Sequence, residues 1–330
     1  MLVRMLLREH QPMPFRGAIA LVLLCTVWAG CGGDGGESSS GSATYTVSSD
    51  GSRDFMDIQS CIRAASAGDT CRVYPGTYGP ISFLGKGLTV QAANGPDSTI
   101  IDAGAAGTAA VAFTHSETVA SVLSGFTIRN GNALGSGTGS AFNGDTAPAA
   151  AGDENGGGIR ILASSPVIEN CVVRDNHADG EGGGIFIAFA SSRPLIRETT
   201  FENNTADGDG GGLYAFSGFP DIQDSVFRGN VALNGGAAGV AFNSRAQFSE
   251  VEFRENTAAQ QGGGLYAYMS SPEVTNSTFD SNAAPNGSAA CASSGSYISF
   301  ENCTFLNNNA DCGSEACPGQ CQFTPRFTIQ

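Results

Sequence analysis

Hydrophobic and polar residues alternate with a period of two in several short segments of this 330-residue sequence. Examples are Ile159-Arg-Ile161, Ile185-Phe-Ile187 and Leu213-Tyr-Ala215, and each of them follows a run of glycines. Strict alternation places every second side chain on one face of an extended chain, and β-branched and aromatic residues favour strands. Three consecutive glycines oppose the start of a helix. The pattern therefore predicts many short strands that are separated by glycine-rich bends.

A second pattern repeats with a fixed period. Phenylalanine recurs every 26 residues, and an asparagine lies three residues after each phenylalanine. Val173 and Asn176 form a sixth copy, 28 residues before the first phenylalanine copy. A fixed period of this length indicates a solenoid in which each repeat forms one turn. The phenylalanines are Phe201, Phe227, Phe253, Phe279 and Phe305, and the asparagines are Asn204, Asn230, Asn256, Asn282 and Asn308.

Two solenoid folds fit this spacing. The segment Ile168-x-x-Cys171-x-Val173-x-x-Asn176 has leucine-rich-repeat spacing, but leucine is almost absent from the repeat positions. The rest of each unit has strand-like alternation where a leucine-rich repeat needs a helix. We therefore predict an all-β fold, a single-stranded right-handed parallel β-helix with about 26 residues per turn over residues 44–310. Stacked turns would form a buried phenylalanine ladder and a hydrogen-bonded asparagine ladder.

The N-terminal end of the repeat region differs from its middle. Asp54 begins an amphipathic segment with Phe55, Ile58 and Ile62 on one face, which predicts a capping helix over residues 54–66. An open solenoid end exposes strand edges, and a helix at this position would cover them.

One interval in the repeat is too long. Asn130 precedes Asn176 by 46 residues, about 20 more than one period. Residues 131–153 are rich in Gly, Ala, Ser and Thr, so we expect an inserted loop that projects from the β-helix.

The GG[GA][IL] and FxxN units resemble the repeats of chlamydial polymorphic outer-membrane proteins, and residues 45–310 resemble the pectate-lyase-like family of right-handed β-helix proteins. The resemblance implies the fold and says little about activity, because these repeats are scaffold. Pectate lyases need calcium-binding acids with an arginine or lysine base, and polygalacturonases need clustered aspartates with a histidine. Neither signature can be placed on this sequence, in which only His115 and His177 follow the N-terminal segment.

Composition narrows the class of protein. Glycine accounts for 46 residues but follows no three-residue period, which excludes collagen. The formal net charge of −15 repels phosphate and no basic patch is visible, so we expect no nucleic-acid partner. The apolar fraction of 41% is sufficient for a hydrophobic core.

The N-terminal residues 1–30 are typical of a secretory signal peptide. Three arginines precede the apolar run 18–28, which is too short to span a membrane. Small residues then precede Cys31, which resembles a bacterial lipobox with a lipid-modified cysteine, although Trp28 stands where leucine is usual. Cleavage without lipidation is the alternative. Residues 31–43 are rich in Gly and Ser and are expected to form a flexible tether.

In an exported protein, the eight cysteines beyond the signal peptide and Cys31 are first interpreted as disulfides. Cys61 and Cys71 are placed to tie the capping helix to the first turn. Cys171 lies in a small inward slot and is expected to be a buried thiol. We predict a Cys-rich cap over residues 311–330, whose tail fits a zinc site poorly because it has no histidine. The C-terminal disulfide candidates are Cys303, Cys312, Cys317 and Cys321.

Acidic residues recur before the glycine triplets. Asp153, Asp179 and Asp207 each lie five residues before the last glycine of a triplet. Glu181 and Asp209 lie two residues after the second and third of these. Stacked turns would place the acids in a column about 5 Å apart, where like charges raise one another's pKa. A bound Ca²⁺ would relieve this repulsion. The alternatives are solvated turns without a ligand, and a glycosidase pair at a corner without an obvious cleft.

These features predict a bacterial cell-envelope lipoprotein whose β-helix is a non-catalytic binding or adhesion module. We expect it to be exported and anchored by a lipid on Cys31, with the outer membrane as its location, or secreted if it is not lipidated. Its partners would be the membrane and a glycan or surface protein, and Ca²⁺ is the one cofactor considered.

Two other functions remain open. One is a polysaccharide-active lyase or glycoside hydrolase, which aromatic and acidic residues gathered on one outward sheet would favour. Tyr214 and Tyr266 occupy equivalent outward slots two turns apart. The other is a structural envelope protein.

Overall fold

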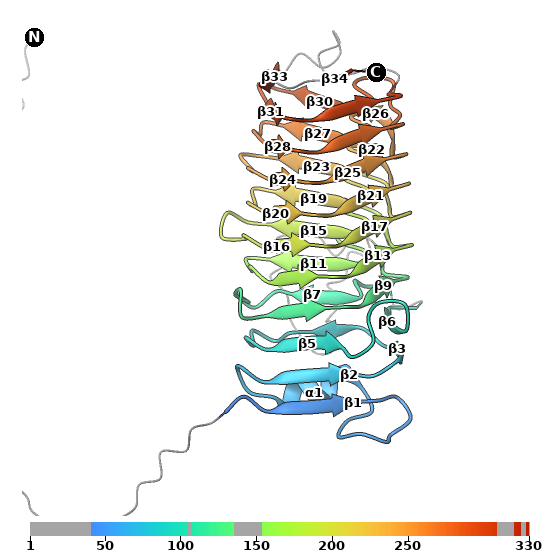
Figure 1. Ribbon diagram of the computed structural model, residues 1–330, viewed down its shortest axis with the longest axis vertical. Helices are drawn as coiled ribbons and strands as arrows, with labels where there is room; N and C mark the ends of the chain where they lie inside the picture. Colours follow the sequence, from blue (N-terminus) through green and yellow to red (C-terminus); the bar gives the residue numbers. More distant parts are fainter. Residues whose placement is uncertain (1–40, 105–106, 135–153, 309–319, 325–327, 330) are drawn as a thin grey trace, which may run out of the picture. The chain divides into compact units, whose positions relative to one another are not determined.

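The alternating segments fold into short strands that stack turn upon turn in four sheets (Figure 1). Among the described residues, every pairing between named strands is parallel. The computed structural model describes residues 41–104, 107–134, 154–308, 320–324 and 328–329. One compact unit spans Ser42–Gln330, whereas the unit Met1–Gly41, with the predicted signal peptide and Cys31, lies almost wholly outside these residues. The predicted all-β parallel β-helix is confirmed for the first of these units.

Sheet A forms one wall of the β-helix. The central residue of each three-residue strand points into the core, so that Ile168, Ile196 and Ile222 lie in register and are fully buried. Its strands are β1 (Thr44–Val47), β2 (Thr70–Val73), β5 (Thr89–Ala92), β8 (Val122–Ser124), β12 (Val167–Glu169), β16 (Leu195–Arg197), β20 (Asp221–Gln223), β24 (Gln247–Ser249), β28 (Glu273–Thr275), β31 (Tyr297–Glu301) and β33 (Gln320–Thr324).

Sheet B carries the phenylalanine ladder. Successive rings stack with centroid distances of 4.2, 5.4, 4.4 and 5.1 Å, and each ring is at most 2% exposed. The predicted buried ladder is therefore confirmed. The strands are β3 (Gly76–Tyr78), β6 (Thr99–Asp102), β9 (Thr127–Arg129), β13 (Val172–Arg174), β17 (Thr200–Glu202), β21 (Val226–Arg228), β25 (Glu252–Arg254), β29 (Thr278–Asp280), β32 (Thr304–Leu306) and β34 (Thr328–Ile329).

The asparagine ladder follows sheet B at the next corner. The Nδ2 of Asn204 donates to Oδ1 of Asn230 at 3.0 Å and to the carbonyl oxygen of Val173 at 2.9 Å. The same Oδ1 of Asn230 accepts the backbone N–H of Asn204 at 3.0 Å. This arrangement recurs from turn to turn, so each buried amide is satisfied by its neighbours. The second predicted ladder is confirmed.

Sheet D is a narrow sheet that follows the asparagine corner. Its inward residues are buried alanines, which leave room for the asparagine amides beside them. Because β10 pairs with β14, residues 132–133 of the predicted insertion belong to the solenoid, and residues 135–153 lie outside the described residues. The strands are β10 (Asn132–Ala133), β14 (His177–Ala178), β18 (Thr205–Ala206), β22 (Val231–Asn234) and β26 (Thr257–Gln261).

Glycine triplets lead from sheet D into sheet C. Gly182 has a φ of 69°, a left-handed conformation that glycine adopts without steric cost. A Cβ on Gly183 would lie 2.1 Å from the carbonyl oxygen of Thr205, so only glycine lets the turns approach this closely. The strands of sheet C are β4 (Ile81–Ser82), β7 (Val111–Phe113), β11 (Ile159–Leu162), β15 (Ile185–Ala188), β19 (Leu213–Phe216), β23 (Ala238–Ala241), β27 (Leu265–Tyr268) and β30 (Ala290–Ser293).

A helix covers the N-terminal end of the β-helix, but it is shorter than predicted. Helix α1 (Ile58–Ala64) begins after Asp57, whose carboxylate accepts the N–H of Ser60 at 2.7 Å. Asp54, the predicted N-cap, instead accepts the N–H of Thr46 at 2.8 Å. The first four residues of the predicted helix 54–66 therefore lie outside the helix. Asp57 caps the helix in place of Asp54, because the carboxylate of Asp54 is already bonded to Thr46.

A disulfide and a lysine tie α1 to the first turns. Cys61 and Cys71 form the expected disulfide, with the Cα atoms 6.1 Å apart. The Lys86 ammonium donates to the carbonyl oxygens of Ile62, Arg63 and Ala65 at 2.7–2.8 Å. These contacts satisfy carbonyl groups that the end of a helix leaves without intrahelical partners.

The C-terminal end differs from the predicted arrangement. β33 pairs with β31, and β34 pairs with β32, so the parallel ladder continues into the predicted cap over residues 311–330. Cys303 is a free, buried thiol and not a disulfide partner, because it points into the core and donates toward the carbonyl of Val274. Cys291, which the sequence did not single out, is disulfide-bonded. The side chains of Cys312, Cys317 and Cys321 lie outside the described residues.

Cys171 is a free and buried thiol, as expected from its inward slot. Burial raises the pKa of this thiol to about 12. A thiol of this kind stays protonated at neutral pH and is a poor nucleophile. It therefore serves the packing of the core.

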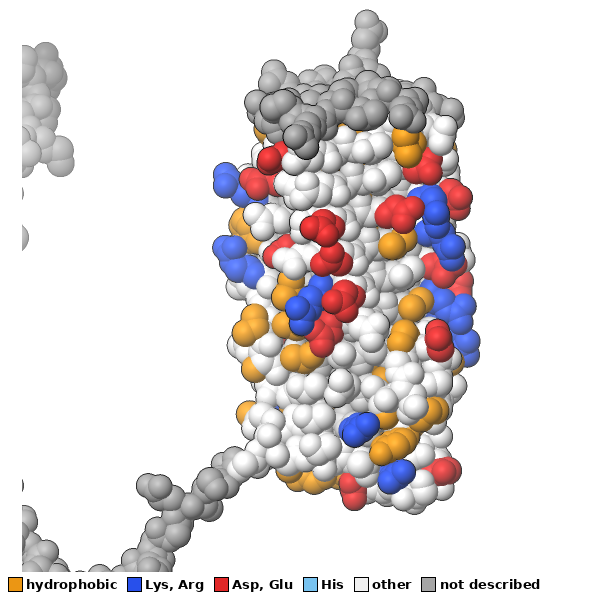
Figure 2. Space-filling model, viewed as in Figure 1, with side chains coloured by type: hydrophobic (Ala, Val, Ile, Leu, Met, Phe, Trp, Pro, Cys, Tyr) orange, Lys and Arg blue, Asp and Glu red, His pale blue; other side chains and the backbone are white. Residues whose placement is uncertain are grey.

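The outward faces of sheets A and B carry charges of both signs side by side (Figure 2). On sheet A, Arg197 donates to Glu169 on the preceding turn at 2.6 Å, and on sheet B Arg228 pairs with Glu202. Exposed pairs of this kind contribute little to stability. Among the described residues, no helix combines the length and apolarity needed to cross a membrane.

Candidate functional site

The predicted acidic column separates into two groups. Asp153 lies outside the described residues. Asp179 and Asp207 remain beside sheet D, where both are exposed. Glu181 and Asp209 directly precede the first glycine of their triplets and are half-buried. Among the described residues, the predicted acids thus divide into an exposed pair and a half-buried pair.

The first group gains a histidine that the sequence interpretation left out. His177, Asp179 and Asp207 each offer one ligand atom, and these atoms lie within 4.8 Å of one another. The Nε2 of His177 lies 3.2 Å from Oδ1 of Asp179, and its Nδ1 lies 2.9 Å from the hydroxyl of Thr205. If Nδ1–H donates to Thr205, Nε2 is left with its lone pair toward the carboxylates. The three side chains have the chemistry to hold a divalent cation.

The second group lies over the outward side of sheet C. Burial, followed by repulsion from Asp209, raises the pKa of the Glu181 carboxyl. Burial also raises the pKa of Asp209, against the hydrogen bond that its carboxylate accepts from Asn234 at 2.8 Å. Burial and then the charges of Asp209 and Glu181 raise the pKa of the nearby Tyr214. Burial thus disfavours the charged form of both carboxyls, and the charge of Asp209 further disfavours that of Glu181.

The predicted outward tyrosines are in equivalent register but are not accessible. Tyr214 pairs in register with Gly239, which in turn pairs with Tyr266. Tyr214 and Tyr266 are only 5% and 7% exposed. A Cβ on Gly239 would lie 2.7 Å from the Tyr214 ring, so the ring occupies the space that this glycine leaves. These tyrosines are packing residues of the outward face and offer little surface to a ligand.

A row of accessible aromatic rings lies at the next corner, between sheets C and A. We define the aromatic row as Phe216, Phe242 and Tyr268, from three successive turns. Phe216 and Phe242 are each 38% exposed, and Tyr268 is half-buried. Ring centroids are 4.8 Å apart for the first pair and 5.3 Å for the second. The sequence signal is an aromatic residue ending the strand after a glycine triplet, as in Leu213–Phe216 and Leu265–Tyr268.

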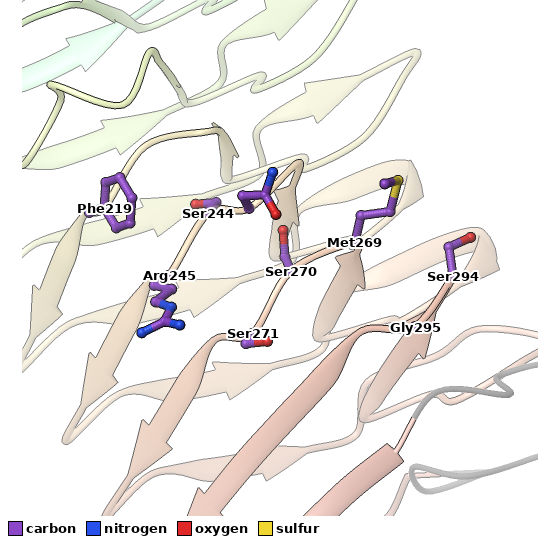
Figure 3. Close-up of a pocket in the computed structure, with 9 residues that line it drawn as sticks. Phe219, Ser244, Arg245, Met269, Ser270, Ser271, Ser294 and Gly295 are labelled. Atoms are coloured by element: carbon purple, nitrogen blue, oxygen red, sulfur yellow. The ribbon is translucent and has the colours of Figure 1, made fainter.

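A pocket lies beside the aromatic row, and Figure 3 shows its lining. We call it the corner pocket; its volume is about 610 Å³. It is lined by loop residues that leave sheet C and enter sheet A on successive turns, and Arg245 is its one charged lining residue. The lining also includes Phe219, Ser244, Met269, Ser270 and Ser294.

Comparison with known proteins identifies the family. A profile described as "Right handed beta helix region" matches residues 97–279, more than half of the chain. The chain belongs to this right-handed β-helix family. A search of curated proteins finds no match.

Solved structures with a similar fold include two enzymes with pectin in their titles. Pectin methylesterase from carrot is 12% identical with a TM-score of 0.46, over 87% of this chain and 88% of that one. Pectin methylesterase PemA from Erwinia chrysanthemi is 12% identical with a TM-score of 0.43, over 82% and 80%. Polygalacturonase from Erwinia carotovora is 12% identical with a TM-score of 0.35, over 84% and 97%. These likenesses concern the fold.

Proposed function

We propose that this protein is an exported β-helix that binds an extended glycan along the corner between sheets C and A. The observation that carries the proposal is the aromatic row, whose rings lie on successive turns of a rigid scaffold. Exposed aromatic rings are unfavourable in water, and a contiguous exposed apolar patch marks an interaction surface. Sugar rings present apolar C–H faces that stack on aromatic rings, and their hydroxyl edges need polar partners.

The surroundings of the aromatic row supply such polar partners. Asn243 follows Phe242 directly, and Ser270 lies two residues after Tyr268; both line the corner pocket. A ligand that stacks on the rings can therefore place its polar edge over serine and asparagine side chains. A purely apolar partner would leave these polar groups without hydrogen bonds, which costs free energy.

A position at the cell envelope fits this proposal. A lipid on Cys31 and a flexible tether over residues 31–43 would leave the β-helix free to reach a polymer near the membrane. Both belong to the proposal, and metabolic labelling with a radioactive fatty acid tests the first. Label that persists in a Cys31→Ser variant would contradict lipidation at this residue.

Glycan cleavage is a second candidate function. Glu181 and Asp209 form a coupled pair of half-buried carboxyls whose pKa values are raised, which is the condition that a carboxyl general acid needs. Both carboxyls are half-buried and the nearby Tyr214 is only 5% exposed, so they offer less surface to a polymer than the aromatic row does. We therefore rank binding above cleavage.

A screen of the purified full chain on a glycan panel tests the proposal, with binding and reducing-end release recorded on the same samples. Binding without release supports a binding protein. Release that is lost in Glu181→Gln or Asp209→Asn supports the enzyme and overturns the non-catalytic assignment. Absence of binding to every glycan contradicts both and leaves a structural envelope role.

A further inference from the structure

One hydroxyl in the corner pocket has no hydrogen-bond partner. Ser270 is only 4% exposed, and its Oγ neither donates nor accepts among the described residues. Figure 3 shows this side chain between Ser244 and Met269, within the pocket lining. A buried hydroxyl without a partner costs free energy, and buried polar groups are almost always hydrogen-bonded.

The equivalent serines of other turns are satisfied. Ser164 donates to the carbonyl oxygen of Leu162 at 2.8 Å, and Ser192 donates to that of Ala188 at 2.5 Å. Ser244 donates to the carbonyl oxygen of Gly218. Ser244 and Ser270 both line the pocket, and of these two only Ser270 lacks a partner in the protein, which indicates that its partner is a ligand atom.

Positive charge gathers at the same place. Arg245 lines the pocket, is exposed and makes no salt bridge to a described carboxylate. Arg193 lies 4.4 Å over the ring of Phe219, which also lines the pocket. No aspartate or glutamate is among the lining residues, although the whole chain has a net charge of −15. The field of the protein therefore repels an anion from most of its surface and favours it here.

We propose that the corner pocket recognises an anionic substituent, a carboxylate or a sulfate group, on the glycan that the aromatic row holds; this inference rests on the proposed function. The guanidinium of Arg245 supplies planar, charged donors that match two oxygens of such a group. Ser270 donates its hydroxyl to the same ligand. Met269, which is 46% exposed, provides an apolar contact between the pocket and the row.

Calorimetric titration of the full chain tests the inference. The probes are cello-oligosaccharides, oligogalacturonates and sulfated carrageenan oligosaccharides of equal length, which separate neutral, carboxylate and sulfate ligands. We expect Arg245→Gln to weaken binding of an anionic probe about ten-fold or more, since a hydrogen bond to a charged group is lost, and to leave a neutral probe unaffected. The loss should shrink at high salt.

Two further variants keep the test specific. Ser270→Ala should weaken anionic binding a few-fold without lowering the melting temperature, because the removed hydroxyl has no partner in the protein. Arg72→Gln, at an exposed arginine on β2, should leave every affinity unchanged. An equal loss for neutral and anionic probes, or an equal effect of Arg72→Gln, would overturn the pocket assignment.

The outcomes also separate the pocket from the proposed function. If neutral and anionic probes bind equally and their binding depends on the aromatic row, the proposed function stands and the pocket assignment is overturned. Anionic binding that needs Arg245 but not the aromatic row supports the pocket and contradicts the proposed function. If none of the probes binds, both are contradicted.

Discussion

At the scale of the residue, the fold is held by columns of identical side chains. Phe227, Phe253 and Phe279 each pack between the rings of the turns before and after them, and the asparagines hydrogen-bond from turn to turn. Both ladders could be predicted because the same residue recurs at one spacing. The burial of Tyr214 could not be predicted, since it depends on the space that Gly239 of the next turn leaves for the ring.

Phe253→Ala should destabilise the protein by about 3–5 kcal/mol, the usual cost of truncating a buried phenylalanine. Phe253 is fully buried, with stacked neighbours at 5.4 and 4.4 Å. Urea denaturation measures the change, and Val119→Ala at a 66% exposed position is the control. A near-neutral result for Phe253→Ala would mean that the ladder does not contribute to the core.

Asp209→Asn should stabilise the protein at neutral pH. Because burial raises the pKa of Asp209 in the folded state, the unfolded chain loses this proton first as the pH rises. Its contribution to stability therefore falls as the pH rises from its ordinary value of 3.8 through the raised one. The asparagine keeps an oxygen that can accept from Asn234.

Melting temperatures measured across pH check this prediction. The gain of Asp209→Asn over wild type should be present at neutral pH and disappear below the ordinary pKa of aspartate. Asp224→Asn, at an exposed corner of another sheet, is the matched control. A gain that does not depend on pH would contradict the raised pKa as its cause.

At the scale of the element, the sequence predicts the strands more accurately than it predicts the two ends of the β-helix. The alternation of apolar and polar residues predicts strands of sheets A, B and C, because the residues that point into the core must be apolar. The start of α1 was missed, since Asp54 and Asp57 are both acceptable caps and only the contact with Thr46 decides between them. The free state of Cys303 likewise depends on the direction of its side chain, which spacing does not specify.

The corner between sheets D and C makes a prediction about metal binding. If the cluster of His177, Asp179 and Asp207 holds a divalent cation, calorimetric titration with CaCl₂ or ZnCl₂ should give a saturable heat. Asp179→Asn combined with Asp207→Asn should abolish it, and Glu252→Gln, on sheet B, should not. A preference for Zn²⁺ would reflect the histidine nitrogen. Equal, negligible heats for wild type and variants would contradict a cation site.

At the scale of the whole molecule, a repeated turn gives a rigid surface on which one side chain per turn forms a row. The fold was predictable because one period governs the core. The aromatic row and the corner pocket were not, because the corner residues follow the strands irregularly: Phe216 and Tyr268 end their strands, whereas Phe242 lies one residue beyond β23. Their alignment exists only after the turns have stacked.

The most direct test of glycan binding at the aromatic row compares the affinity of wild type with that of Phe216→Ser/Phe242→Ser for the best glycan of the panel. Both rings are exposed, so the double variant should fold with an unchanged melting temperature, and Val119→Ser controls for the loss of an exposed apolar side chain. We predict that affinity falls at least ten-fold in the double variant and is unchanged in the control. Unchanged affinity in a folded double variant would contradict the proposed binding surface.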